Sequence, residues 1–109
     1  MSEATAVDDA CLHAGLLWEL GWLAAAAGEY GGASQRLEEA RQIYAELGMI
    51  ARVMETDALL AKCALGQGRP ENARICASQV WSYLQEHGAA AMDEAVPTYL
   101  TIAEVFEEL

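Results

Sequence analysis

The feature that most constrains this chain is that it repeats itself at a distance of 40 residues. Shifting the sequence against itself by this distance aligns small residues, turn residues and leucines. The identical pairs include Leu20 with Leu60, Ala24 with Ala64, Gly28 with Gly68, Ala33 with Ala73, Glu46 with Glu86 and Gly48 with Gly88. A fixed period of this length is typical of stacked units that bury their apolar faces against one another. The repeat therefore predicts stacked units that share one continuous core.

The repeat divides the chain into two and a half units, and its length is that of a single domain. The first unit covers about residues 9–48, the second about 49–88 and a half unit about 92–109, after a flexible tail over residues 1–7. Each full unit is predicted to form two helices, and the half unit one. We therefore expect an all-α fold of five helices, arranged as antiparallel hairpins.

The first unit contains the signals that begin, orient and end helices. Asp8 or Asp9 is expected to cap the first helix, which runs to about Ala27. In the second helix, apolar residues recur at spacings of three and four, which places them on one packed face. They are Ala33, Leu37, Ala40, Tyr44 and Leu47. Gly48 follows where a left-handed C-terminal cap belongs.

The second unit and the half unit repeat this plan. The helix over about 49–67 is expected to bury Val53, Leu60, Ala61 and Ala64. The next helix begins at Pro70, ends before Gly88, and is expected to bury Ala73, Ala77, Val80, Trp81 and Leu84. The fifth helix, from about Asp93, places Ile102, Ala103 and Phe106 where the third has Leu60, Ala61 and Ala64.

The first unit resembles the tetratricopeptide repeat, through Leu20-Gly21, Gly28-Glu29-Tyr30, Ala33 and Ala40. In the second unit Leu60, Ala61, Gly68 and Ala73 match the pattern, while Pro70 and Val80 depart from it. The period of 40 to 42 residues exceeds the usual 34, and is similar to a longer variant found in large bacterial regulatory proteins. The resemblance implies a right-handed superhelix of hairpins. It also implies a non-catalytic scaffold that binds a protein or peptide, within a larger bacterial regulatory or signalling protein.

In that family the partner lies in a concave groove lined by the first helix of each unit. The register of this chain places Trp18, Trp22, Glu55, Lys62, Leu65 and Glu104 there. The two tryptophans are four residues apart and share one helical face, and tryptophan is a common anchor of binding hot spots. The alternative is that both tryptophans pack in the core. Lys62 is expected to pair with Glu55 or Glu104.

A second functional hypothesis is self-association through the fifth helix, which has no partner helix within the repeat plan. Its apolar residues Tyr99, Ile102 and Phe106 would form an exposed stripe. A second copy of the chain would cover this stripe in a homodimer, and so would a further repeat of a longer protein.

Composition excludes several other classes of function. With 17 acidic and 6 basic residues, the net charge of −11 repels phosphate backbones, so no nucleic-acid partner is expected. Cys11, Cys63 and Cys76 lack metal-ligand spacing, which favours reduced thiols in a cytoplasmic protein. No apolar run approaches the roughly 18 residues of a membrane span.

The residue types that carry catalysis are sparse. His13 and His87 are the only histidines, and His87 is expected in the last turn of a helix, where a cation suits the helix dipole. Asp57, Asp93 and Glu94 have no matching base or phosphate-binding loop. The sequence therefore predicts no enzymatic activity, no cofactor and no metal.

Overall fold

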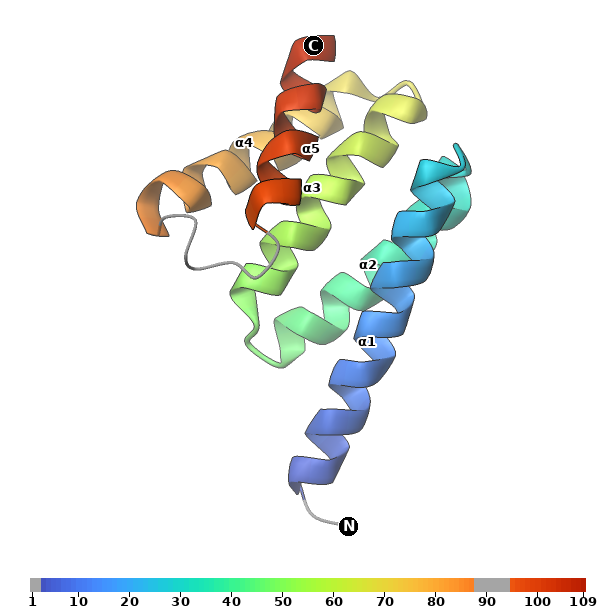
Figure 1. The fold of residues 1–109 in the computed structure, drawn as a ribbon, viewed down its shortest axis with the longest axis vertical. Coiled ribbons are helices and arrows are strands. Elements are labelled where there is room, and N and C mark those ends of the chain that lie inside the picture. Colours follow the sequence, from blue (N-terminus) through green and yellow to red (C-terminus); the bar gives the residue numbers. More distant parts are fainter. Residues whose placement is uncertain (1–2, 88–94) are drawn as a thin grey trace.

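The computed structural model describes the backbone of residues 3–87 and 95–109, and the side chains of residues 8–87, 98 and 100–109. Within these ranges the chain forms helices joined by short turns, without strands (Figure 1). The helices are α1 (Glu3–Ala26), α2 (Tyr30–Glu46), α3 (Ile50–Gly66), α4 (Pro70–His87) and α5 (Ala95–Glu108). The predicted all-α fold with five helices is therefore confirmed for the described residues. The superhelical arrangement stays a prediction.

The first helix is longer than the sequence suggested. It begins at Glu3 instead of near Asp9, so Asp8 and Asp9 lie inside the helix and do not cap it. The flexible tail predicted for residues 1–7 is likewise helical from residue 3 on. No glycine or proline interrupts this segment, and its alanines favour helix, so helix formation extends toward the N-terminus. The predicted start at Asp93 and the predicted cap at Gly88 lie outside the described residues.

Each of the three turns between α1 and α4 is closed by a glycine in the left-handed region. Gly28, Gly48 and Gly68 have φ angles of 84°, 72° and 75°. The N–H of the residue after each glycine donates a hydrogen bond back to the preceding helix. These bonds run from Glu29 to the carbonyl of Ala24, from Met49 to Tyr44 and from Arg69 to Ala64. This is the Schellman arrangement, and it confirms the cap predicted at Gly48.

Two clusters of buried side chains form the core, and α3 contributes to both. The first lies between α1, α2 and α3, with Ala14, Trp18, Ala25, Ala33, Leu37, Ala40, Tyr44, Val53, Leu59 and Cys63. The second lies between α3, α4 and α5, with Ala58, Ala61, Ala64, Ala73, Ala77, Val80, Leu84, Ile102 and Val105. The alanines let helix axes approach closely. Gly21 acts in the same way, because a Cβ atom there would lie 2.7 Å from the Cγ of Leu37.

Most residues predicted to face inward are buried. Those confirmed are Ala33, Leu37, Ala40, Tyr44, Val53, Ala61, Ala64, Ala73, Ala77, Val80 and Leu84. Trp81 is 42% exposed, so its predicted place in the core is wrong. Val80 and Leu84 already occupy the inward positions of α4, and the residue after Val80 lies about 100° further around the helix.

Helix α5 turns a different face inward from the one predicted. Its described buried residues are Thr98, Ile102 and Val105, whereas Ala103 and Phe106 are exposed. The spacing of four and three from Thr98 defines a single inward stripe, which excludes positions 103 and 106. At the predicted shift of 42 residues, this stripe corresponds to Thr56, Leu60 and Cys63 of α3.

The glycine turns provide a direct test of this fold. Gly48→Ala should lower the free energy of unfolding by about 1 kcal/mol, because it forces a Cβ atom into the left-handed region. Gly32→Ala is the matched control, since Gly32 is helical and a Cβ atom there would have no neighbouring atom within 4 Å. It should leave stability unchanged or raise it by up to about 1 kcal/mol. Urea denaturation followed by circular dichroism measures both, and equal effects would contradict the assigned turn.

Candidate functional site

The residues predicted to line a concave groove gather along the seam between α3 and α5. Trp18, Trp22 and Glu55 border a hollow of about 20 Å³, together with Thr98 and Thr101 of α5. Lys62, Leu65 and Glu104 border a second hollow of about 100 Å³. Helix α3 contacts both α1 and α5, and Figure 1 shows α1 and α5 beside it. We call this region the α1–α3–α5 surface.

The two tryptophans differ sharply in exposure. Trp18 is 8% exposed and belongs to the first core cluster, whereas Trp22 is 47% exposed. The indole Nε1 of Trp18 is buried and has no hydrogen-bond partner among the described residues. The hypothesis that both tryptophans anchor a partner is therefore wrong for Trp18, which α2 and α3 cover. It stays a prediction for Trp22.

Trp18 is held by an arginine that sequence reasoning missed. The guanidinium carbon of Arg52 lies 5.1 Å from the ring centroid of Trp18 and 5.0 Å from that of Tyr44. Its Nη2 donates a hydrogen bond of 3.0 Å to the Tyr44 hydroxyl, and its Nη1 donates one of 2.6 Å to Glu55 Oε2. Arg52 thus joins α1, α2 and α3. The i, i+3 spacing of Arg52 and Glu55 was the only sequence signal of this cluster.

Glu55 belongs to this buried cluster and not to an open groove. It is only 1% exposed, so its predicted role in contacting a partner is wrong. A buried carboxylate requires a cation or several hydrogen bonds, and Arg52 supplies both charge and a donor. Burial lowers the pKa of Arg52, but the Tyr44 hydroxyl and the Glu55 charge outweigh this effect and raise the pKa.

The remaining predicted groove residues are accessible. The Nζ of Lys62 lies 3.8 Å from Glu104 Oε2, which confirms the expected pairing with Glu104 and joins α3 to α5. Both side chains are well exposed, so the pair contributes little to stability. Leu65 is partly exposed beside them. Polar groups and an apolar side chain are therefore available together at this end of the surface.

The residues proposed for self-association do not share one exposed face. Ile102 is 2% exposed and lies in the second core cluster, so its predicted role in a dimer interface is wrong. Its burial follows from its place on the inward stripe of α5. Phe106 is 40% exposed, and the side chain of Tyr99 lies outside the described residues.

A second surface, which sequence reasoning missed, lies between α2 and α4. Two adjoining hollows of about 600 and 730 Å³ share Glu38 of α2, Leu60 of α3 and Cys76 of α4. We call them together the α2–α4 groove. Leu60 was predicted to face inward, but it is partly exposed here. Burial, followed by the charge of Asp57, raises the pKa of the Cys76 thiol, so a thiolate nucleophile is disfavoured.

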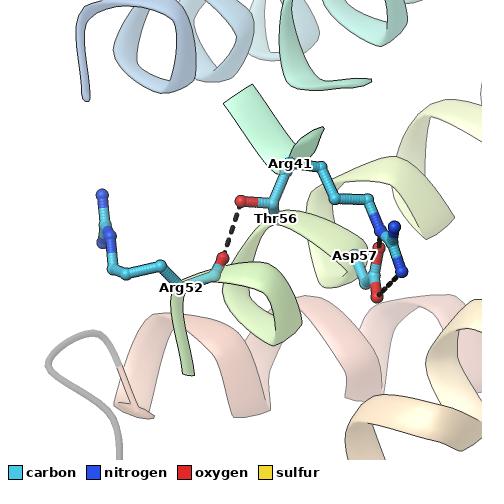
Figure 2. A network of polar contacts seen from close by, with 4 residues as sticks. All are labelled: Arg41, Arg52, Thr56 and Asp57. Atoms are coloured by element: carbon cyan, nitrogen blue, oxygen red, sulfur yellow. Dashed lines mark hydrogen bonds and ion pairs between the residues drawn. The ribbon is translucent and has the colours of Figure 1, made fainter. Parts of the chain in front are cut away.

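An ion pair between α2 and α3 borders this groove. Figure 2 shows the guanidinium of Arg41 directed to Asp57, while the side chain of Arg52 points away from this pair. Its Nε donates to Asp57 Oδ1 at 2.6 Å and its Nη2 to Oδ2 at 3.4 Å. The Asp57 side chain is 3% exposed. Burial raises the pKa of Asp57 by more than the hydrogen bond and charge of Arg41 lower it.

The part of the chain that the structure describes offers neither a metal site nor a membrane-spanning helix. No group of three or more His, Cys, Asp or Glu residues there could hold a metal ion, and Cys11, Cys63 and Cys76 are free thiols. The ring of His87 lies 4.4 Å from that of Tyr83 in the last turn of α4. Among the described helices, none combines the length and the apolar character that crossing a membrane requires.

Comparison of the chain with known protein families, with curated proteins and with solved structures returned no match. Its own residues and their geometry are therefore what indicates its function.

Replacing Arg52 should be far more costly than replacing a surface arginine. Arg52→Ala removes the cation from buried Glu55, and we expect the free energy of unfolding to fall by about 3 kcal/mol or more. The matched control is Arg74→Ala, because Arg74 pairs with a glutamate three residues away in an exposed position. Its effect should stay below about 1 kcal/mol. Chemical denaturation measures both, and similar losses would contradict the structural role of Arg52.

Asp57 should make stability depend on pH in a defined direction. Because its pKa is raised in the folded state, the stability that it contributes is fully present below its unfolded pKa, near about 3.9. That stability is lost as pH rises through the folded pKa. Asp57→Asn removes this contribution, so the stability of the variant relative to the wild type should increase as pH rises from about 4 through the folded pKa of Asp57. Urea denaturation of both proteins at several pH values tests the sign of this change in the free energy of unfolding.

A second substitution checks that this dependence comes from the ion pair. Arg41→Ala removes the cation that lowers the pKa of Asp57, so it should steepen the loss of stability with rising pH while Asp57 is present. The same substitution in the Asp57→Asn background should leave the pH dependence as it is in Asp57→Asn alone. An equal change in both backgrounds would assign the titration to another group.

Proposed function

We propose that this chain is a non-catalytic scaffold that binds a protein or peptide on its α1–α3–α5 surface. The observation that carries the proposal is the exposure of Trp22, which is 47% accessible although Trp18, one turn away, is buried. An exposed tryptophan costs solvation free energy unless a partner covers it, and tryptophan is the residue most enriched in binding hot spots.

The surroundings of Trp22 fit the recognition of a peptide. Trp18, which forms part of the same hollow, packs against the guanidinium of Arg52, and this contact restricts the rotamers of Trp18 before binding. A rigid surface loses less conformational entropy when it binds. Further along the seam, the exposed Lys62–Glu104 pair provides polar groups that can orient a partner. An extended segment or a helix could contact both places.

The tetratricopeptide resemblance and a place in a larger bacterial regulatory or signalling protein belong to the same proposal. Their support is the 40-residue register, together with the three glycine turns that close in the same way. A cytoplasmic location fits the three free cysteines, since reduced thiols are usual in that compartment.

A peptide-display selection against the intact chain tests the proposal. Selected peptides should bind Trp22→Ala at least about 30-fold more weakly than the wild type, which corresponds to a hot spot of about 2 kcal/mol. Trp81→Ala is the matched control, because Trp81 is 42% exposed on α4 and should leave affinity within about twofold. Fluorescence anisotropy gives the affinities, and circular dichroism confirms that both variants fold.

Two outcomes would contradict the proposed surface. Peptides that bind Trp22→Ala as tightly as the wild type would place the binding site elsewhere. A selection that yields no peptide sensitive to Trp22, from libraries of both extended and helical peptides, would remove the basis for this function.

A further inference from the structure

Helix α1 carries a row of exposed leucines that the proposed function does not use. Leu12, Leu16, Leu20 and Leu23 are 69%, 64%, 43% and 56% exposed. Their spacings of four, four and three place them in one stripe along the helix. We call this row the leucine stripe. Single exposed leucines are common on protein surfaces, but a contiguous apolar row marks an interaction site.

The leucine stripe lies on the side of α1 that faces away from the other helices. The buried residues of α1 are Ala14, Trp18, Gly21 and Ala25, which pack toward α2 and α3. At about 100° per residue, the two sets lie on opposite sides of the helix. The residues that α1 contributes to the α1–α3–α5 surface are Trp18 and Trp22. Neither belongs to the leucine stripe, so the stripe is separate from that surface.

The repeat register shows what the equivalent positions do elsewhere in this chain. Leu16, Leu20 and Leu23 correspond to Thr56, Leu60 and Cys63 of α3, and to Thr98, Ile102 and Val105 of α5. Thr56 and Cys63 are 0% exposed, and the three residues of α5 are at most 4% exposed. Leu60 is the one partly exposed member. The positions that other helices cover on α3 and α5 are therefore exposed to solvent on α1.

In both covered cases, a preceding helix contributes to the cover. Cys63 shares a core cluster with Leu37 and Ala40 of α2, and α2 contacts α3. Ile102 and Val105 share a cluster with residues of α4, and α4 contacts α5. The element that fits this position is thus an α-helix lying against its neighbour. The all-leucine character of the stripe on α1 requires an apolar face on that helix.

The charges beside the stripe define the partner further. Asp8, Asp9 and Glu19 lie three or four residues from stripe leucines, whereas α1 contains no lysine or arginine. His13 is the only residue of α1 that can become cationic. The whole chain carries −11, so a second copy would bring two acidic helices together, while a basic helix would be attracted.

We infer that the leucine stripe docks an amphipathic helix of a partner protein, with an apolar face and basic flanks. This helix would lie on α1 as α2 lies on α3. The partner is thereby defined by its chemistry: leucine-like side chains against the stripe, and lysine or arginine opposite Asp8, Asp9 and Glu19.

A synthetic peptide of leucine and lysine, patterned as an amphipathic helix of about five turns, tests this inference. Its binding to the intact chain is measured by fluorescence anisotropy. We expect Leu16→Glu and Leu23→Glu each to weaken binding at least tenfold. Ile75→Glu is the matched control, since Ile75 is 55% exposed on α4, and it should change affinity less than twofold. Affinity should also fall between about 0.05 and 0.3 M NaCl.

Four results would overturn the inference. A scrambled peptide of the same composition that binds equally would show attraction by charge alone. A leucine–glutamate peptide that binds equally would remove the basic requirement. Unchanged binding by both leucine variants would exclude the stripe. Sedimentation that shows a dimer dissociated by Leu16→Glu would make a second copy the occupant.

The variant Trp22→Ala separates this site from the proposed function. It should bind the leucine–lysine peptide as tightly as the wild type. If Trp22→Ala instead loses this peptide while Leu16→Glu retains it, the peptide occupies the α1–α3–α5 surface, and the stripe has no role in binding it.

Discussion

The participation of α3 in both core clusters is the constraint on which the rest of the structure depends. This helix contributes Val53, Leu59 and Cys63 to the core with α1 and α2. It contributes Ala58, Ala61 and Ala64 to the core with α4 and α5. A helix buried in this way cannot rotate without exposing one set, so it fixes the positions of both hairpins.

Polar residues in α3 add specificity to this packing. Glu55 and Asp57 are almost completely buried, and each is paired with an arginine. Arg52 ties Glu55 to Tyr44 of α2, while Arg41 of α2 reaches Asp57 from the other side (Figure 2). A shift of α2 along α3 by one helical turn would break the Arg41–Asp57 pair and the bond from Arg52 to Tyr44. The arginines therefore set the register between α2 and α3, at a cost in desolvation.

The fold was more predictable from the sequence than the site, for a physical reason. Helix bounds and inward faces follow from spacing and glycine caps, which are local, and residues such as Ala33, Leu37 and Gly48 obey them. Whether Trp18 or Trp22 is buried depends on Arg52, which lies in a different unit of the repeat, and spacing along α1 does not contain that information. Glu55 was misassigned although its i, i+3 spacing from Arg52 is visible in the sequence, because its burial depends on the helices packed around α3. The α2–α4 groove depends on how α2 and α4 are placed around Leu60 of α3, which no local pattern encodes.

Helices α1, α3 and α5 carry different residues at the three positions that correspond to the leucine stripe, and these residues differ with the helix that covers them. In α3 the register holds Thr56, Leu60 and Cys63, and Thr56 satisfies its hydroxyl by donating to the carbonyl of Arg52 at 2.7 Å (Figure 2). Thr56 and Cys63 are smaller than leucine and allow a neighbouring helix to approach closely. In α1 all three positions hold leucine, which fills more volume and suits a neighbour at greater distance. A helix seated on α1 would therefore lie further from its axis than α2 lies from that of α3, and it would be held by apolar side chains instead of buried ion pairs.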